Sequence, residues 1–190
     1  GMMNPIFYYS ESGRWNKPFP SHDVGTYPQA NGQTYGGDMP VEESGNMLIL
    51  ATAIAIIEGN ADYAAKHWDV LTTWVDYLKK EGLDPDNQLC TDDFAGHFAH
   101  NTNLSIKAIM GIAGYGKMAG MLGKKEIADS YLATAREMAG KWIAMAKDGN
   151  HYKLTFDKSG TWSQKYNLVW DRLLDLNIFP SEIAESETAY

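Results

Sequence analysis

The sequence contains little cysteine and little positive charge. Cys90 is the single cysteine among its 190 residues, so the chain can form neither an intrachain disulfide nor a cysteine-based zinc cluster. Its 16 lysines and arginines are outnumbered by 24 aspartates and glutamates, which leaves a net charge of -8. A nucleic-acid-binding protein needs a cationic surface to neutralise phosphates, and an anionic membrane attracts the same kind of surface. The composition therefore argues against both partners.

Long hydrophobic runs are also missing. The longest, from Met47 to Ile57, is interrupted by Thr52 and is about half as long as the roughly 20 residues that cross a bilayer. Residues 1–5 show no targeting segment, and the glycine before Met2 is typical of a cloning remnant. With 44% apolar and 21% charged residues, the chain has the composition and length of one globular domain with a sizeable core.

Several common catalytic motifs are absent from the sequence. It has no P-loop, no dinucleotide-binding fingerprint, no Gly-x-Ser-x-Gly elbow and no His-Glu-x-x-His pair. These motifs position phosphates, nucleophilic serines or a catalytic zinc ion. Nucleotide-dependent enzymes and the familiar serine and zinc hydrolases therefore receive no support.

The residues that are present divide into a loop region and a set of helices. Residues 1–45 are rich in proline, glycine and aromatic side chains, a mixture typical of a long ordered loop that packs on a scaffold. From residue 46 onward, apolar residues recur at helical spacing. We therefore predict an all-α domain that follows an ordered, aromatic-rich loop region.

The predicted helices alternate in character. Residues 46–57 and 103–122 are apolar on nearly every face, which indicates buried helices, whereas residues 62–80 and 124–147 are amphipathic. A third buried helix is expected to start near Tyr166. Its apolar residues would be Leu168, Val169, Leu173 and Leu174.

This alternation repeats along the chain. An Asn-Leu or Asn-Met pair lies at or near the start of each buried helix, at Asn46, Asn103 and Asn167. We therefore predict helical hairpins at residues 46–81, 103–147 and 166–190, the last one incomplete, with the buried helices inside and the amphipathic helices outside. Such hairpins form part of an (α/α)6 toroid, a ring that needs about six hairpins to close. A plain up-and-down helical bundle is the alternative.

In a toroid the loops that lead into the inner helices meet at one face, and three such loops carry polar clusters. The clusters are Glu42 and Glu43 in the first loop, Asp92, Asp93, His97 and His100 in the second, and Trp162, Gln164, Lys165 and Tyr166 in the third. Acids before a helix can also be simple caps, and loop aspartates can bind backbone N–H groups. Asp93, His97 and His100 could ligate a metal, but their spacing matches no metal motif, and we predict none.

Four strings in these loops resemble the fungal and bacterial glutaminase A family. They are His22–Pro28, Gly37–Met47, Thr91–Gly96 and Trp162–Asp171. The resemblance extends from about residue 8 to residue 190, and it is to the first half to two-thirds of that family's six-helical-hairpin domain. It implies a hydrolase that converts L-glutamine to L-glutamate and ammonia without a cofactor. It also implies a secreted or periplasmic location.

The resemblance and the polar clusters together suggest roles for individual residues. We expect Glu42 or Glu43, and Asp92 or Asp93, to act as general base or to bind the substrate amine. Tyr166 is a candidate proton donor, and Lys165 is a candidate anchor for the substrate carboxylate. The other expected substrate-binding residues are Asp23, Tyr27, Asn46, Asn103, Trp162 and Gln164.

Two further functions fit the same sequence. The predicted toroid resembles that of several glycoside hydrolases, in which two carboxylates about 5–10 Å apart flank the sugar. Glu42 or Glu43 could face Asp92 or Asp93 in this way, with Trp162 as a platform for the sugar. The other function is that of a non-catalytic binding or scaffold module. An incomplete ring would expose an apolar edge, which predicts a homodimer.

Overall fold

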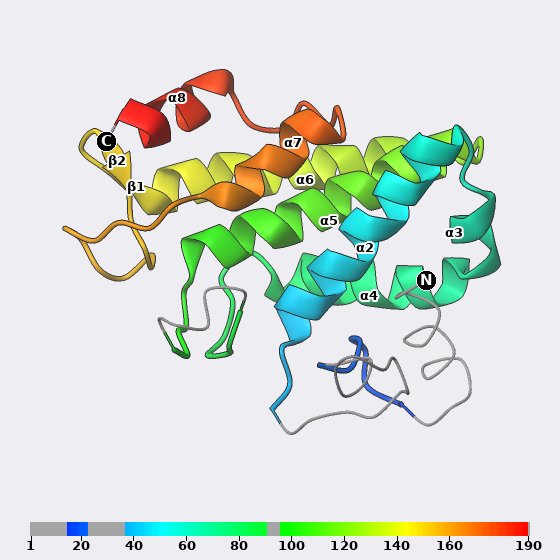
Figure 1. Cartoon of the computed structure of the whole chain (residues 1–190), viewed down its shortest axis with the longest axis horizontal. Coiled ribbons are helices and arrows are strands. Elements are labelled where there is room, and N and C mark those ends of the chain that lie inside the picture. Colours follow the sequence, from blue (N-terminus) through cyan, green and yellow to red (C-terminus); the bar gives the residue numbers. More distant parts are fainter. Residues whose placement is uncertain (1–14, 23–36, 91–95, 190) are drawn as a thin grey trace.

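The computed structural model describes residues 15–22, 37–90 and 96–189 (Figure 1). These residues fold mostly as helices, so the predicted all-α class is confirmed. The helices are α2 (Pro40–Glu58), α3 (Asp62–Lys66), α4 (Trp68–Glu81), α5 (Thr102–Met121), α6 (Lys125–Ala146), the 3-10 turn η2 (Tyr166–Leu168), α7 (Val169–Leu173) and α8 (Ser181–Ala189). Strands β1 (Lys147–Asp148) and β2 (His151–Tyr152) form one antiparallel hairpin.

Helices α2 and α5 lie side by side at the centre of the molecule (Figure 1). Glycines allow this close approach: a Cβ at Gly111 would lie 3.4 Å from the Gly45 Cα and 3.0 Å from the Leu78 Cδ1 atom of α4. Nearly all of α5 is buried, as its apolar sequence predicts. Side chains at the two glycines would push the central helices apart.

Helices α4 and α6 form the outer layer and run opposite to α2 and α5 (Figure 1). Each buries one face, with Trp74 and Leu78 of α4 and Met138 and Trp142 of α6 in the core. The predicted pairing of a buried helix with an amphipathic one is therefore confirmed for two hairpins. Closure of a six-hairpin ring stays a prediction.

The first outer segment is interrupted, contrary to the prediction of one helix over residues 62–80. The chain leaves helical geometry at His67, where φ is -120° and ψ is 21°. The His67 ring packs on Tyr63, with 4.9 Å between ring centroids. The segment therefore forms α3 and α4 on either side of His67.

The third inner helix is much shorter than predicted. It consists of η2 and α7, and it leaves Val169 46% and Leu173 63% exposed. The chain turns back because the Asp171 carboxylate accepts hydrogen bonds from the backbone N–H groups of Ile178 (3.0 Å) and Phe179 (2.8 Å). The prediction that Val169 and Leu173 are buried is therefore wrong for this chain.

Helix α2 is also less enclosed than its all-round apolar sequence predicts. Leu50 is 42% and Ile57 84% exposed, because α4 and α5 cover only part of its circumference. By length and composition α2 could cross a membrane, yet more than half of it is packed inside the protein, as in a core helix. The exposed apolar residues of α2 and α7 form open flanks, and a homodimer through them stays a prediction.

Candidate functional site

The three inner helices α2, α5 and η2–α7 begin at the same end of the molecule (Figure 1). We call this end the helix-start face, defined by the first turns of α2, α5 and η2. Two sets of contacts join the helices near these turns: Glu42 of α2 pairs with Lys107 in the second turn of α5, and Asn103 of α5 binds Asn167 of η2. The loops that carry the predicted polar clusters therefore do lead to a common face.

The first acidic cluster lies within α2 rather than before it. Helix α2 begins at Pro40, whose missing N–H makes proline suitable for the first helical position. The side-chain oxygen of Gln88 accepts hydrogen bonds from the N–H groups of Val41 (3.0 Å) and Glu42 (3.4 Å). A residue from a distant loop thus caps α2, and the Glu42 side chain is left for another role.

Glu42 forms a buried ion pair with Lys107. The two charged atoms lie 2.5 Å apart, with the side chains of Lys107 and Glu42 only 4% and 2% exposed. Asn46 donates a further, long hydrogen bond of 3.5 Å to the same carboxylate oxygen. The lysine stem fills the space beside Gly45, where a Cβ would lie 2.6 Å from the lysine Cγ. Glu42 is therefore held between α2 and α5.

Glu43 occupies a different position on the same turn. One residue advances an α-helix by about 100°, so Glu43 does not follow Glu42 towards α5. It is only half-buried. Of the two acids predicted as candidates, Glu43 is the one whose position suits contact with a substrate.

Asparagines connect the second and third inner helices. The Asn103 side-chain oxygen accepts a hydrogen bond from the Asn167 backbone N–H (3.2 Å), and the Asn167 amide donates to the Asn103 carbonyl (3.0 Å). Asn101 caps α5 by accepting from the N–H of Leu104 at 2.9 Å. Asn103 is therefore buried in a structural contact, and its predicted role with a substrate remains to be tested.

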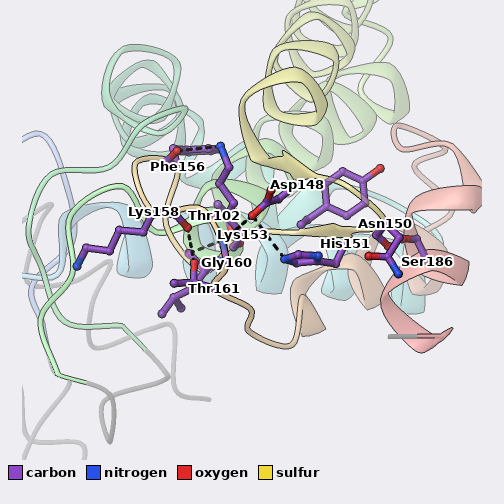
Figure 2. Close-up of polar contacts among 12 residues, drawn as sticks. Thr102, Asp148, Asn150, His151, Lys153, Phe156, Lys158, Gly160, Thr161 and Ser186 are labelled. Atoms are coloured by element: carbon purple, nitrogen blue, oxygen red, sulfur yellow. Dashed lines mark hydrogen bonds and ion pairs between the residues drawn. The ribbon is translucent and has the colours of Figure 1, made fainter.

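The third polar cluster follows a well-braced segment, residues 147–161, whose polar contacts are shown in Figure 2. Lys153 donates to the carbonyls of Met145 (3.0 Å) and Phe156 (3.2 Å), and Thr102 donates to the Lys153 carbonyl (2.6 Å). The Gly160 N–H donates to Asp148 at 2.6 Å. These bonds tie the end of α6 to the start of α5 and hold the chain that leads to η2.

Within the third cluster, side chains differ in accessibility. Trp162 is 42% exposed, Gln164 is exposed and Tyr166 is half-buried. Lys165 is buried, and its ammonium donates to the carbonyls of Ser163 (2.6 Å) and Tyr152 (2.9 Å). Its third partner is Glu187 of α8, at 3.4 Å. A substrate carboxylate at Lys165 would have to take the place of Glu187.

The remaining predicted residues are distributed as follows. Asp23, Tyr27, Asp92 and Asp93 lie outside the described residues. His97 is exposed, and His100 contacts Asp84, with 2.7 Å between Nδ1 and Oδ1. That hydrogen bond raises the pKa of His100. Among residues 15–22, 37–90 and 96–189, no three metal-binding side chains gather.

Two grooves stand out in the described part of the chain, and neither is lined by the first turns of α2 and α5. One runs along α4 beside residues 15–17, and the other lies between α7 and α8. Leu168 of η2 borders the second groove, so the helix-start face meets a groove only on that side in the described residues, and a substrate pocket over the first turns of α2 and α5 is a proposal.

Comparison with known families explains why four sequence strings, among them Gly37–Met47 and Trp162–Asp171, occur in one chain. The sequence pattern of the glutaminase A six helical-hairpin domain matches residues 1–190. This chain belongs to that family. It is 35% identical over 196 residues to "Glutaminase A" of Aspergillus oryzae, covering 100% of this chain and 28% of the relative. It is 28% identical over 249 residues to "Probable glutaminase/05536" of Arthroderma benhamiae, covering 95% of this chain and 28% of the relative.

Three residues that organise the site in this glutaminase A family member were not predicted from the sequence: Lys107, Gln88 and Glu187. Lys107 lies inside an otherwise apolar helix, and a charge in such a segment is a signal that it needs a buried partner. Gln88 and Glu187 carry no comparable signal, because each sits in a polar segment and meets its partner only through folding. The family resemblance itself was correctly predicted from the four strings.

Because Lys165 is buried, the stability of the protein is expected to depend on pH. Burial lowers the pKa of Lys165 from 10.5 to about 8, although the charge of Glu187 opposes the shift. Between pH 8 and 10.5, Lys165 is mostly protonated in the unfolded chain and mostly neutral in the folded protein. The contribution of Lys165 to the free energy of unfolding therefore rises with pH, by up to about 3 kcal/mol.

The comparison is between the wild type and Lys165→Met, by urea unfolding from pH 7 to 10. We expect the free energy of unfolding of the wild type, relative to the variant, to increase over this range. The difference cancels contributions from tyrosines, which both proteins share. A difference that stays constant with pH would contradict this prediction.

Proposed function

We propose that this chain is part of a glutaminase-like amidohydrolase that converts L-glutamine and water to L-glutamate and ammonia. The observation that carries the proposal is the match of the glutaminase A six helical-hairpin domain to the whole chain. The relative from Aspergillus oryzae is itself named glutaminase A. The chain spans about 28% of the length of both relatives, so the activity belongs to the proposal rather than to the family assignment.

The chemistry requires a base, a proton donor and groups that bind the substrate headgroup. Water attacks the side-chain amide carbon, a base takes its proton, and the leaving ammonia receives a proton. We assign the base to Glu43 because it lies on the helix-start face and is half-buried, whereas Glu42 is committed to Lys107. Asp92 or Asp93 is the alternative base or the partner of the substrate amine.

Tyr166 is the proposed proton donor. It is half-buried in the first position of η2, beside the asparagine contact that joins η2 to α5. Lys165 remains the proposed anchor of the substrate carboxylate, which requires displacement of Glu187. Asp23, Tyr27, Asn46, Asn103, Trp162 and Gln164 complete the proposed substrate-binding set.

One observation favours a second candidate, an enzyme that hydrolyses glycosidic bonds. Trp162 presents 42% of its surface on the third loop, and exposed tryptophans commonly provide an apolar face for ligands. This alternative needs two carboxylates about 5–10 Å apart. A non-catalytic binding module is the third reading of the same fold.

A melting experiment combined with an ammonia assay separates these functions. The chain is heated with L-glutamine, L-glutamate or a panel of mono- and oligosaccharides. A ligand at about 100 times its dissociation constant adds roughly 2.7 kcal/mol, equivalent to a few degrees. We expect stabilisation by glutamine or glutamate and ammonia release from glutamine, with the Aspergillus oryzae relative as positive control. Stabilisation by sugars alone would contradict the proposal.

A further inference from the structure

A groove of about 450 Å³ lies between α7 and α8, away from the first turns of α2 and α5. Three charged side chains line it: the Arg172 guanidinium at the end of α7, the Glu185 carboxylate on α8, and Asp171, whose carboxylate already accepts hydrogen bonds from two backbone N–H groups. Arg172 and Glu185 are exposed. Within the part of the chain that the structure describes, neither side chain has an ion-pair partner. The groove therefore offers a ligand the cationic Arg172 and the anionic Glu185, beside an Asp171 carboxylate that is occupied by the N–H groups of Ile178 and Phe179.

The rest of the lining combines polar and apolar side chains. Asn177 and Ser181 supply an amide and a hydroxyl, while Leu168 and Phe179 supply apolar surface. This combination suits a short side chain that ends in a polar group. A ligand would thus find partners for both of its charges and for its side chain.

The groove is held in shape by the turn that shortens α7. The Asp171 carboxylate binds the N–H groups of Ile178 and Phe179, and Asp175 and Asn177 adopt positive φ angles of 49° and 56°. Lys117 of α5 also donates to the carbonyls of Leu174 (2.8 Å) and Asp175 (2.9 Å). A preformed site loses less conformational entropy when a ligand binds.

We propose that this groove binds a small zwitterion with an α-amino-acid headgroup. The ligand carboxylate lies on Arg172, whose planar guanidinium can bind both carboxylate oxygens. The ligand ammonium lies on Glu185, and its side chain extends towards Asn177 and Ser181. The zwitterion class follows from the groove alone, whereas the choice of glutamate and glutamine as first probes rests on the proposed function.

Titration of the chain with L-glutamate and L-glutamine, followed by NMR and calorimetry, tests the proposal. We expect the backbone signals of Asn177 and Ser181 to shift. N-acetyl-L-glutamine lacks the ammonium, and L-glutamine with an amidated α-carboxylate lacks the anion. Each analogue is expected to bind about tenfold more weakly, the loss expected from removing one charge-assisted contact.

Matched variants assign the two charges. Arg172→Gln and Glu185→Gln are each expected to weaken binding by about fivefold or more. Arg136→Gln and Glu182→Gln remove the same charges from exposed positions that do not line the groove, and they are expected to bind as the wild type does.

Three results would overturn the proposal: no signal change at about 10 mM ligand, equal binding by wild type and both groove variants, or shifts confined to the first turns of α2 and α5. The ammonia assay is independent of this outcome. A chain that binds glutamate in the groove but releases no ammonia supports the groove and contradicts the proposed function. Ammonia release without groove binding supports the proposed function and contradicts the groove proposal.

Discussion

Replacement of Lys107 by methionine is expected to lower the free energy of unfolding by about 3–5 kcal/mol. The substitution keeps the apolar stem but removes the ammonium that lies 2.5 Å from the Glu42 carboxylate. Because Glu42 is only 2% exposed, water cannot replace the lost partner. The hydrogen bond from Asn46, at 3.5 Å, is too long to compensate for the lost ammonium. Urea unfolding monitored by tryptophan fluorescence and circular dichroism measures the loss.

A double variant separates the ion pair from simple loss of packing. Glu42→Leu combined with Lys107→Met removes both charges and is expected to recover most of the lost stability, since replacing a whole buried pair by apolar residues is often neutral. The matched control is Lys125→Met, which breaks an exposed pair with Asp129 on α6 and is expected to cost less than about 1 kcal/mol. A loss in Lys107→Met no larger than that control would contradict the prediction.

Substitution of Glu43 by glutamine is expected to reduce glutamine turnover by about 10²–10⁴-fold, the range for removal of a general base. Glutamine has nearly the same shape but cannot accept the proton of the attacking water. The variant should unfold at nearly the same denaturant concentration, since Glu43 is only half-buried in the first turn of α2. Turnover is measured as ammonia released in the full-length protein.

The control lies on the same helix. Glu58→Gln makes the same change at the last residue of α2, an exposed position at the opposite end from the helix-start face, and should leave turnover unchanged. Asp93→Asn is the parallel test of the second acidic cluster. If Glu43→Gln and Asp93→Asn both keep wild-type turnover, the proposed assignments of the base are wrong.

The helical hairpins could be predicted from the sequence because their signal is local. The apolar residues of α5 and the one-sided pattern of α6 recur at the spacing of an α-helix, and each pattern is complete within about twenty residues. The predicted limits 103–122 and 124–147 lie within a residue or two of the observed helices. The four strings that carry the family resemblance are equally local, and the family match bears them out.

The sequence alone did not reveal where α7 ends or which acid is buried. Helix α7 stops because Asp171 binds N–H groups seven and eight residues later, although the apolar pattern continues through Leu173 and Leu174. Residues 42 and 43 are both glutamates, and the sequence does not distinguish them. Only the approach of α5 makes Glu42 the partner of Lys107.

By itself, then, this sequence determined the main helices of the first two hairpins, their pairing and the family. The tertiary structure decided the polar contacts: Glu42 with Lys107, Gln88 with the start of α2, and Lys165 with Glu187. The physical reason is the range of the interactions involved. Helical periodicity is set by neighbours three and four residues apart, whereas these contacts join residues separated by 22 to 65 positions, and no short sequence pattern specifies which distant residues will meet.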